Sequence, residues 1–544
     1  MLPDWLARAA ESRPMQLALR CGSVRWSFAE LDRHGTRLAR QLATAGVKEG
    51  ERVALLAANS PQFVACVHAL TRLGAILVPL NVRLTKDELC WQLSDVHATT
   101  LLHDTTYATI AAEIGQALPT ITRATLDDEA IGDELVISCL PEAELSLRTL
   151  IDLDATQAIM YTSGTTGYPK GAIITYGMQW WSATMSALNL GYQRDDCWLA
   201  CLPFFHIGGL SLLMKSVIYG MSIVIHKKFD AVAINRSIVE DRVTMISVVA
   251  VMLQRMLAAL DEEHHDGTIG RYPATLRCVL LGGGPAPLPL LEDCARRAIP
   301  VVQTYGLTEA CSQAVTLAPE DALSKLGSAG RPLLSVQLQI MRDGLPVGPN
   351  EPGEIYVQGP TITQGYADKP EATAKALQNG WLATGDLGYL DAEGYLYVLD
   401  RRADLIISGG ENVYPAEIES VLLSHPSVEE AGVCGMADAH WGQVPIGFVV
   451  LRAGSSVSEQ VLKEYIAQRL ARYKQLSTIH IVGQLPCNSS GKLLRRELPK
   501  LLPSALVHGI IIRPAIEVGR LDTLLSQQRG YLRTMVNAVI DGLD

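Results

Sequence analysis

The chain alternates short apolar segments with longer amphipathic ones. Phe28–Ala45 carries Leu31, Leu38 and Leu42 at helical spacing, and the apolar run Arg52–Ala57 follows it. Strands that alternate with helices predict parallel sheets covered by helices on both faces. Further strands of this kind are expected at Ala75–Pro79, Ile223–His226, Met245–Val249, Cys278–Leu281 and Val301–Tyr305. The sequence therefore predicts an α/β fold.

The length and the change of texture along the chain predict several domains. A chain of 544 residues exceeds what one hydrophobic core usually supports. Beyond Gly327, glycine and proline become dense, which favours a smaller β unit, and Asp400-Arg401-Arg402 interrupts the apolar pattern. We expect a large N-terminal domain over 1–399, a small mobile α+β domain over 400–500, and an extension over 501–544 of undecided order.

Charge and cysteine content exclude several classes of protein. The net charge is −11, whereas a nucleic-acid-binding domain normally shows a basic face. The 11 cysteines form no C-x-x-C pair, which suits reduced thiols in the cytoplasm.

Met1–Glu11 contains Asp4 and lacks the pattern of a secretory signal. The apolar stretch Gly208–Ile225 holds Lys215 in its middle and predicts a buried helix and strand rather than a membrane span.

A glycine- and hydroxyl-rich segment follows the apolar run Ala158–Met160. Tyr161–Gly171 reads Tyr-Thr-Ser-Gly-Thr-Thr-Gly-Tyr-Pro-Lys-Gly. Glycines let backbone N–H groups converge on a phosphate, hydroxyls add donors and a lysine adds charge. A Walker loop requires Gly-Lys-Ser/Thr, which is absent from this segment. The segment predicts a polyphosphate-binding loop, with donors expected from Thr162, Ser163, Gly164, Thr165, Thr166, Gly167 and Lys170.

Two further loops follow expected strands. Gly282-Gly283-Gly284-Pro285 comes after Val279–Leu281, and Gly306–Glu309 comes after Val301–Tyr305. Ligands of parallel sheets bind at the carboxyl ends of the strands, where such loops lie. The triple glycine allows flat approach of an aromatic ring, although three glycines also suit a loose loop.

These motifs and their order resemble the adenylate-forming superfamily, which includes acyl-CoA synthetases, over about residues 1–500. The resemblance implies ATP as a substrate and Mg²⁺ held by Glu309 with the ATP phosphates. It implies that Tyr305 meets adenine beside Gly306, that Thr308 meets phosphate, and that Gly282, Gly283 and Gly284 form the adenine floor. Asp386, in Thr384-Gly385-Asp386, matches the family's ribose-binding aspartate, and Arg401 matches an arginine that reaches ribose or phosphate.

The same resemblance assigns roles to the C-terminal section. Lys492, in Asn488–Lys492, matches the lysine that bridges the substrate carboxylate and the α-phosphate. Ser408–Asn412, with Gly409 and Gly410, resembles the segment that replaces this lysine and lines the pantetheine tunnel of coenzyme A. Asp400 matches the family's hinge, about which the small domain turns between the two half-reactions.

Longer strings resemble a narrower family, the 2-succinylbenzoate–CoA ligases of bacterial menaquinone synthesis. They are Ser186–Gly191, Lys215–Met221, Gly282–Glu292 and Glu309–Gln313. The acid of that family keeps a second carboxylate, whose burial requires a cation or several donors. His206, in Pro203–Gly209, is the first candidate, with Ser312 and Gln313 as helpers. His206 equally suits gating of the site or a buried structural hydrogen bond.

Alternative functions stay open at this stage. The chemistry also suits another fatty or aryl acid, an adenylation domain that serves a carrier protein, or an inactive binding protein on the same fold. No phosphopantetheine-type Gly-x-Ser segment follows residue 500, and the presence of Lys492, Glu309 and Asp386 argues against inactivity. The expected partners are small-molecule substrates in the cytoplasm, without nucleic acid or membrane segment. A homo-oligomer remains open.

Overall fold

The computed structural model describes residues 1–128, 134–162, 169–262, 269–284, 286–401, 404–408, 411–438, 441–470, 472–487 and 493–502. The chain divides into two compact units, Met1–Leu498 and Pro499–Asp544. All of the elements below belong to the first unit except the end of a 3₁₀ helix at Arg495–Leu501. Of the predicted extension 501–544, only Leu501 and Leu502 lie within the described residues.

The first sheet has seven strands in the order β11-β10-β5-β4-β6-β7-β8. The strands are β4 (Arg52–Leu56), β5 (Ile76–Pro79), β6 (Thr100–His103), β7 (Thr122–Thr125), β8 (Leu135–Val136), β10 (Thr156–Thr162) and β11 (Lys170–Thr175). All neighbours pair in parallel except β10 and β11, which form an antiparallel hairpin. The helices α3 (Pro61–Leu73), α4 (Lys86–Asp95) and α5 (Ala108–Ala117) connect its parallel strands.

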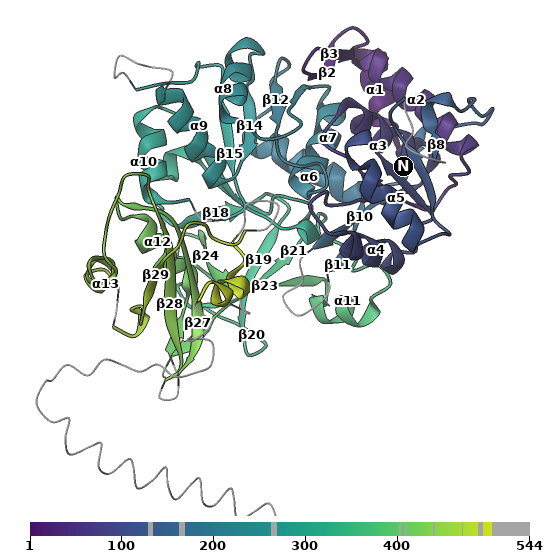
Figure 1. The fold of residues 1–544 in the computed structure, drawn as a ribbon. Coiled ribbons are helices and arrows are strands. Elements are labelled where there is room, and N and C mark those ends of the chain that lie inside the picture. Colours follow the sequence, from purple (N-terminus) through teal and green to yellow (C-terminus); the bar gives the residue numbers. More distant parts are fainter. Residues whose placement is uncertain are drawn as a thin grey trace, which may run out of the picture. The chain divides into compact units, whose positions relative to one another are not determined.

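The large sheet begins with a parallel section that carries two of the predicted loops. A hairpin of β2 (Leu17–Cys21) and β3 (Val24–Ser27) edges the parallel strands β13 (Ser222–Ile225), β12 (Cys197–Ala200), β14 (Met245–Val248), β15 (Cys278–Leu281) and β16 (Val301–Tyr305). The helices α8 (Ala231–Glu240), α9 (Ala250–Glu262) and α10 (Leu288–Arg296) pack on one face of β12, β14 and β15 (Figure 1). This parallel section confirms the α/β prediction.

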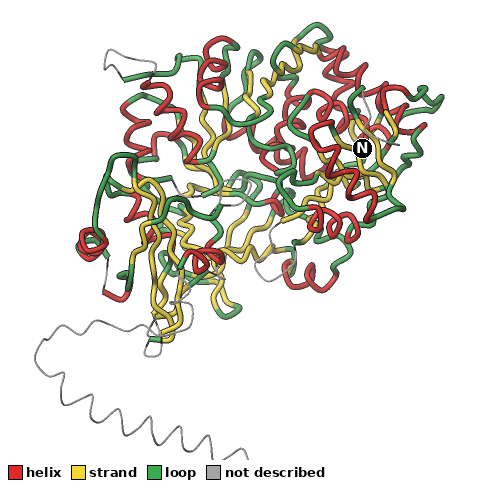
Figure 2. Tube along the Cα trace, in the orientation of Figure 1, coloured by secondary structure: helices red, strands yellow, loops and turns green. Residues whose placement is uncertain are grey.

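The same sheet then continues with antiparallel strands. These are β17 (Val315–Leu317), β18 (Ser328–Pro332), β24 (Leu396–Arg401), β23 (Trp381–Leu390), β21 (Gly353–Gln358), β19 (Gln337–Arg342) and β20 (Leu345–Pro346), with β22 (Leu377–Gln378) against β23. Figure 2 shows helices in red beside the yellow strands of the N-terminal sheets. The smaller β unit expected beyond Gly327 is therefore an extension of the large sheet, joined to it where β17 turns antiparallel to β16.

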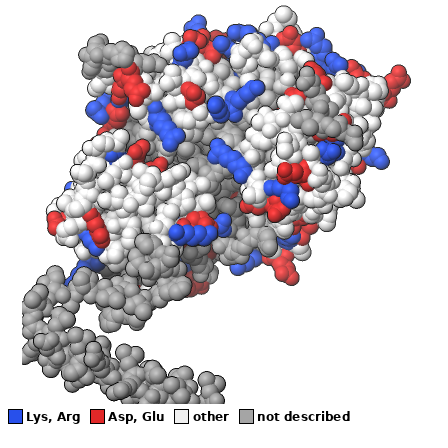
Figure 3. Space-filling model, in the orientation of Figure 1, with Lys and Arg blue, Asp and Glu red and all other residues white. Residues whose placement is uncertain are grey.

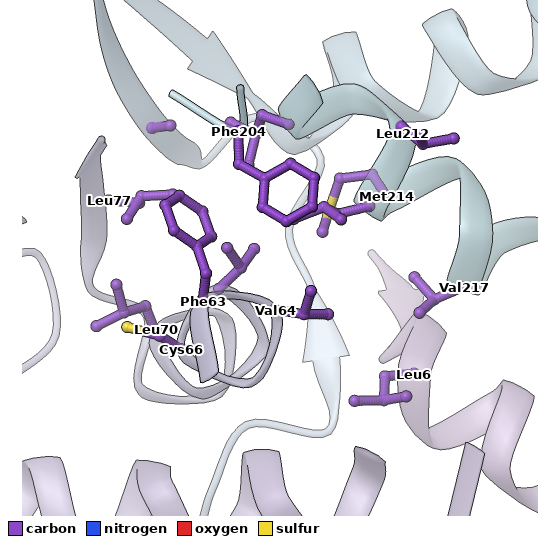
Figure 4. Close-up of a cluster of buried hydrophobic side chains, with 14 of the residues drawn as sticks. Leu6, Phe63, Val64, Cys66, Leu70, Leu77, Phe204, Leu212, Met214 and Val217 are labelled. Carbon is purple, nitrogen blue, oxygen red and sulfur yellow. The ribbon is translucent and has the colours of Figure 1, made fainter. Parts of the chain in front are cut away.

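A hydrophobic core lies between the sheets. It includes residues of α1 (Trp5–Ser12), α2 (Phe28–Thr44), α3 and α7 (Ile207–Tyr219). The rings of Phe63 and Phe204 meet edge to face, 5.3 Å apart, and Figure 4 shows them pointing at one another beside Leu77 and Met214. Burial of each such ring contributes about 1.5–3 kcal/mol. This contact fixes the segment that leads into α7.

The C-terminal section forms a separate five-stranded sheet. Its strands are β25 (Ile406–Ser408), β26 (Glu411–Val413), β27 (Val428–Asp438), β28 (Gly442–Leu451) and β29 (Ile479–Ile481), with α12 (Pro415–Leu423) and α13 (Glu459–Ala467) packed on them. This section mixes helices and strands, as the predicted α+β composition requires. The domain boundary at Asp400 stays a prediction. In the structure, β24 continues through Asp400 and ends at Arg401.

The remaining elements and the surface complete the fold. They include β1 (Leu2–Pro3) paired with β9 (Leu150–Ile151), α6 (Tyr176–Leu190), α11 (Pro370–Ala376), and 3₁₀ helices at Thr105–Tyr107, Ile137–Cys139, Thr308–Ala310, Pro319–Asp321 and Arg472–Lys474. On the face in Figure 3, Lys and Arg are interspersed with Asp and Glu. In the described residues no helix is long and apolar enough to cross a membrane. Gly208–Ile225 forms α7 and β13, as predicted.

Candidate active site

The β10–β11 hairpin defines the base of the predicted phosphate loop. Thr162 and Lys170 pair directly across the ladder, so both chain ends of the loop emerge together. The side-chain oxygen of Thr162 lies 3.5 Å from the carbonyl oxygen of Lys170. Ser163, Gly164, Thr165, Thr166 and Gly167 lie outside the described residues. The apolar run Ala158–Met160 lies within β10, before the loop, whereas the antiparallel strand after the loop was not predicted.

Glu309 lies beside the base of this loop, although it comes from the other sheet. It occupies a 3₁₀ turn directly after β16, and its Oε1 accepts a hydrogen bond from Thr162 Oγ1 at 3.3 Å. The same oxygen accepts a second hydrogen bond from the hydroxyl of Tyr366 at 3.0 Å. Burial and the neighbouring Glu309 carboxylate raise the pKa of Tyr366, which keeps its hydroxyl protonated as a donor. The structure thus brings two sequence-predicted residues together.

This arrangement fits a magnesium ion shared with a polyphosphate. Mg²⁺ prefers hard oxygen ligands and commonly uses one or two carboxylates plus substrate phosphates. Among the described residues no group of three or more His, Cys, Asp or Glu side chains is arranged to hold a metal. The half-buried carboxylate of Glu309 would supply one ligand to the ion. Phosphate oxygens and water would then fill most of the other coordination positions.

The turn after β16 requires glycine at its first position. A Cβ on Gly306 would lie 1.5 Å from the carbonyl oxygen of Ser312, so no other residue fits without a backbone shift. Cys311 and Ser312 have φ angles of 52° and 91°, in the left-handed region. Non-glycine residues in this region are typical of sites under functional constraint. Thr308 opens the 3₁₀ helix of this turn, next to Glu309.

The residues predicted to meet the nucleoside also lie together. The hydroxyl of Tyr305 donates to Asp386 Oδ2 at 2.8 Å. Asp386 on β23 pairs in register with Arg401 on β24, which places these two positions side by side. The backbone N–H of Asp386 donates to Thr384 Oγ1 at 3.1 Å, which fixes the aspartate at its turn. The side chains of Arg401 and Asp400 lie outside the described part of the structure.

The triple glycine follows β15, as expected. Gly283 has a φ of +83°, and a Cβ on Gly284 would meet nothing within 4 Å. A Cβ on Gly282 would lie 3.0 Å from the methyl group of Thr304 on β16. Open space above a flat backbone suits a planar ring, and Gly283 is required by its conformation. Pro285 lies outside the described residues.

His206 stands at the start of α7 on a firmly held segment. Asn59 accepts the N–H of Phe204 at 2.9 Å and donates to the carbonyl of Leu202 at 2.9 Å. The ring of His206 packs on Phe205, with centroids 4.6 Å apart. Burial, with a smaller contribution from Arg83, lowers the pKa of His206 to about 4. The imidazole is therefore neutral at pH 7 and supplies hydrogen bonds rather than charge.

A buried lysine near Gln313 was not among the predicted site residues. Lys215 on α7 is 3% exposed, and its Nζ donates to Gln313 Oε1 at 3.3 Å. The Nζ also lies 5.7 Å from the ring centroid of Trp198. Burial lowers the pKa of Lys215 to about 8, so most molecules still carry the charge at pH 7. The signal in the sequence was a single lysine inside an otherwise apolar helix.

Gln313 presents an unused donor at the same place. Its Nε2 is buried and has no hydrogen-bond partner among the described residues. A buried amide donor without a partner costs about 1–3 kcal/mol, which a bound acceptor would recover. Lys215 and Gln313 together offer a charge and an N–H to an anion. Ser312 immediately precedes Gln313, at the strained turn described above.

Most of the residues predicted to act from the C-terminal section are not among the described residues. These are Lys492, Gly409 and Gly410. The base of the Lys492 segment is described: Cys487 pairs with Leu493, and the N–H of Leu494 donates to the carbonyl of Pro486 at 2.8 Å. Arg495 then binds Glu419 through Nε at 2.9 Å and Nη2 at 2.6 Å. This base is tied to α12.

Comparison with known proteins places the chain in a family. A model described as AMP-binding enzyme matches residues 6–367, and one described as AMP-binding enzyme C-terminal domain matches residues 417–492. The chain belongs to the AMP-binding enzyme family.

Individual proteins within this family are similar to the chain over almost its whole length. The 2-succinylbenzoate–CoA ligase of Geobacillus kaustophilus is 52% identical over 502 residues, which cover 92% of this chain and 98% of the relative. The o-succinylbenzoate CoA synthetase from Bacillus subtilis in complex with its acyl-adenylate intermediate OSB-AMP is 46% identical, with a TM-score of 0.84, and the match covers 91% of this chain and 98% of that one. The same enzyme with ATP and a magnesium ion is 46% identical, with a TM-score of 0.83 and coverages of 91% and 99%.

Proposed function

We propose that this protein ligates 2-succinylbenzoate to coenzyme A through an acyl-adenylate, giving 2-succinylbenzoyl-CoA, AMP and diphosphate for menaquinone synthesis. The near full-length likeness to 2-succinylbenzoate–CoA ligases supports the assignment. In the structure, the main support for this function is the hydrogen bond between Thr162 and Glu309 at the base of the phosphate loop. The consumption of ATP and coenzyme A, with all 11 cysteines free of disulfides, supports a cytoplasmic location.

The reaction has two steps with different needs. A carboxylate is a poor acyl donor, and its attack on the α-phosphate of ATP releases diphosphate and forms a mixed anhydride. The thiol of coenzyme A then attacks the acyl carbon, and AMP leaves. Bound magnesium would neutralise charge on the phosphates. Glu309 presents its carboxylate to that cation, Thr162 and Lys170 bind phosphate, and Asp386 accepts the ribose hydroxyls.

The choice of acid rests on Lys215 and Gln313. The second carboxylate of 2-succinylbenzoate takes no part in the reaction, and its burial without a partner is costly. His206 is neutral, so the positive charge comes from Lys215, and the free N–H of Gln313 completes the contact. Ser312 and His206 serve as neutral neighbours. A simple fatty acid would leave this buried cation without a counter-charge.

We propose the remaining assignments by analogy with the family, whose C-terminal domain model matches residues 417–492. Lys492 bridges the reacting carboxylate and the α-phosphate in the first step. The segment with Gly409 and Gly410 serves coenzyme A in the second, and Asp400 is the hinge between the two arrangements. The small domain spans 400–500, and residues 501–544 are an extension to it.

A panel of acids tests the proposed function. Release of diphosphate is measured with ATP, magnesium and either 2-succinylbenzoate, 4-oxo-4-phenylbutanoate, benzoate or octanoate, and CoA-thioester formation is followed by mass. The expected result is a kcat/KM for 2-succinylbenzoate at least about 100-fold above the others, because each of them lacks the second carboxylate. Activity with octanoate or benzoate, but not with 2-succinylbenzoate, would refute the substrate. Failure of every acid would refute the reaction.

Recognition of the acid is expected to weaken at alkaline pH. Lys215 has a pKa of about 8 in the folded protein, below its usual value, so its charge is present below about pH 8 and lost above it. The kcat/KM for 2-succinylbenzoate should therefore fall about tenfold per pH unit above this value. The groups described around Lys215 are Gln313, Trp198 and Cys311, and burial raises the pKa of Cys311 to about 12.

The control for this pH profile is internal. The kcat/KM for 4-oxo-4-phenylbutanoate, which lacks the second carboxylate, is measured in the same buffers. Its profile should be flat where that of 2-succinylbenzoate falls. A parallel decline of the two profiles would assign the pH effect to another group.

A further inference from the structure

Tyr366 has no place in the sequence motifs, yet it contacts both charged groups of the candidate phosphate site. Its hydroxyl donates to Glu309 Oε1 at 3.0 Å. The Nζ of Lys170, at the end of the phosphate loop, lies 5.3 Å from the centroid of its ring. One side chain therefore links the carboxylate from the large sheet to the lysine from the first sheet.

The backbone around Tyr366 is held on two sides. Tyr366 forms an antiparallel bridge with Ala172 on β11, and the N–H of Ala367 donates to the carbonyl of Gly171 at 2.8 Å. On the other side, the N–H of Thr363 donates to the carbonyl of Glu309 at 2.7 Å. The segment 363–367 thus lies between β11 and the turn that carries Glu309. Its position, and with it that of the Tyr366 hydroxyl, is fixed relative to both.

Two neighbouring hydroxyl groups donate hydrogen bonds to the same carboxylate oxygen of Glu309. Thr162 Oγ1 and the Tyr366 hydroxyl both donate to Oε1, and in the described part of the chain Oε2 accepts no hydrogen bond. A carboxylate with one oxygen tethered has a defined plane, and its second oxygen is available to a cation. Hydrogen bonds of this kind orient metal ligands, and their loss commonly lowers metal affinity about 10- to 100-fold.

We propose that Tyr366 is a positioning residue that orients Glu309 for the magnesium–nucleotide complex and keeps Lys170 beside the phosphate loop. The inference rests on the proposed function, since it assumes that Glu309 meets the metal. Tyr366 acts through the carboxylate and through the aromatic ring, and these two actions are chemically separable. The hydroxyl serves Glu309, and the ring serves Lys170 through a cation–π contact.

The substitution Tyr366→Phe isolates the first action, because it removes the hydroxyl and retains the ring. Binding of magnesium with a non-hydrolysable ATP analogue is measured by calorimetry, and binding of AMP is measured without metal. We expect about tenfold weaker binding of the magnesium–analogue complex and unchanged binding of AMP. The magnesium concentration for half-maximal adenylation should rise by a similar factor, while KM for 2-succinylbenzoate stays within about twofold.

A matched variant controls for the loss of a buried phenol. Tyr395 donates its hydroxyl to Asp321 Oδ2 at 2.8 Å, and neither residue belongs to the candidate site. Tyr395→Phe removes the same kind of hydrogen bond and should leave magnesium–analogue binding unchanged. Equal losses in both variants, or an equal loss of AMP binding in Tyr366→Phe, would reduce Tyr366 to a structural residue and overturn the proposal. So would unchanged magnesium–analogue affinity in Tyr366→Phe.

The wild-type protein separates this proposal from the proposed function. Wild-type protein that binds the magnesium–analogue complex and forms the acyl-adenylate supports the function whatever the variant does. If wild-type protein bound neither the complex nor AMP, the proposed function would fall first, and the role of Tyr366 with it.

Discussion

Replacement of Glu309 by glutamine is expected to lower kcat/KM for ATP in adenylation about 100- to 1000-fold. The amide keeps the size of the side chain and an oxygen that accepts from Thr162 and Tyr366, so the local fold should persist. It removes the negative charge that would face the metal beside the phosphates. The measurement is exchange of labelled diphosphate into ATP over a range of magnesium concentrations.

The second half-reaction is the control for this variant. Thioester formation from supplied 2-succinylbenzoyl-adenylate releases AMP rather than diphosphate, so it should retain most of its rate in Glu309→Gln. Equal loss in the two half-reactions would indicate damage to the fold. Adenylation at the wild-type rate would remove Glu309 from the reaction.

Replacement of Lys215 by methionine should raise KM for 2-succinylbenzoate about 100-fold, because loss of one partner of a buried ion pair costs about 3 kcal/mol. Methionine fills much of the space of the lysine stem on the apolar helix α7, so folding should not suffer. The measurement is steady-state kinetics with each substrate varied in turn. KM for ATP should remain within about twofold, since Lys215 contacts Gln313 and Trp198 rather than the nucleotide residues.

A second substrate sharpens this test. 4-Oxo-4-phenylbutanoate has the same reacting chain without the aromatic carboxylate, so its KM should change little in Lys215→Met. An equal rise in KM for both acids would assign Lys215 to packing of the pocket. An unchanged KM for 2-succinylbenzoate would move the second carboxylate to another partner.

The local patterns of the sequence predicted most of the fold. Helical spacing located α2 almost to the residue, and short apolar runs located β4, β5 and the strands from β13 to β16. These elements are determined by burial of their own side chains, which periodicity reports. The antiparallel pairing of β11 with β10, and of β17 with β16, depends on partners that periodicity does not identify.

The candidate site was predicted only as separate motifs. Sequence reasoning placed Thr162 and Glu309 in different loops, and only tertiary packing brings them within hydrogen-bond distance. Tyr305 and Asp386 were likewise expected at the nucleotide, but their hydrogen bond crosses 81 residues. Tyr366 was missed because it lies outside the segments that were singled out in the sequence. Each of these contacts depends on the packing of strands and loops that lie far apart in the sequence, which no local pattern encodes.

The preference for His206 over Lys215 has a different cause. A histidine in a loop before a helix is a familiar catalytic signal, whereas a lysine inside an apolar helix suggests only an interruption. The charge that each residue carries depends on its burial, which lowers the pKa of His206 to about 4 and that of Lys215 to about 8. At neutral pH only the lysine is a cation, and the sequence alone does not contain that information.

The hydroxyl of Thr162 comes from β10, and the carboxylate it meets comes from the turn after β16, in a different sheet. Both parts of the chain therefore contribute to the proposed nucleotide site, and a fragment that ended before Val301 would lack Glu309. A ligand bound at this site would contact residues from both sheets. Binding of the ligand would therefore also stabilise the packing of the two sheets in the N-terminal region. Fusion points, cuts and permuted termini for an engineered version belong outside the stretch from Thr156 to Arg401, because Asp386 and Arg401 also contribute to this site.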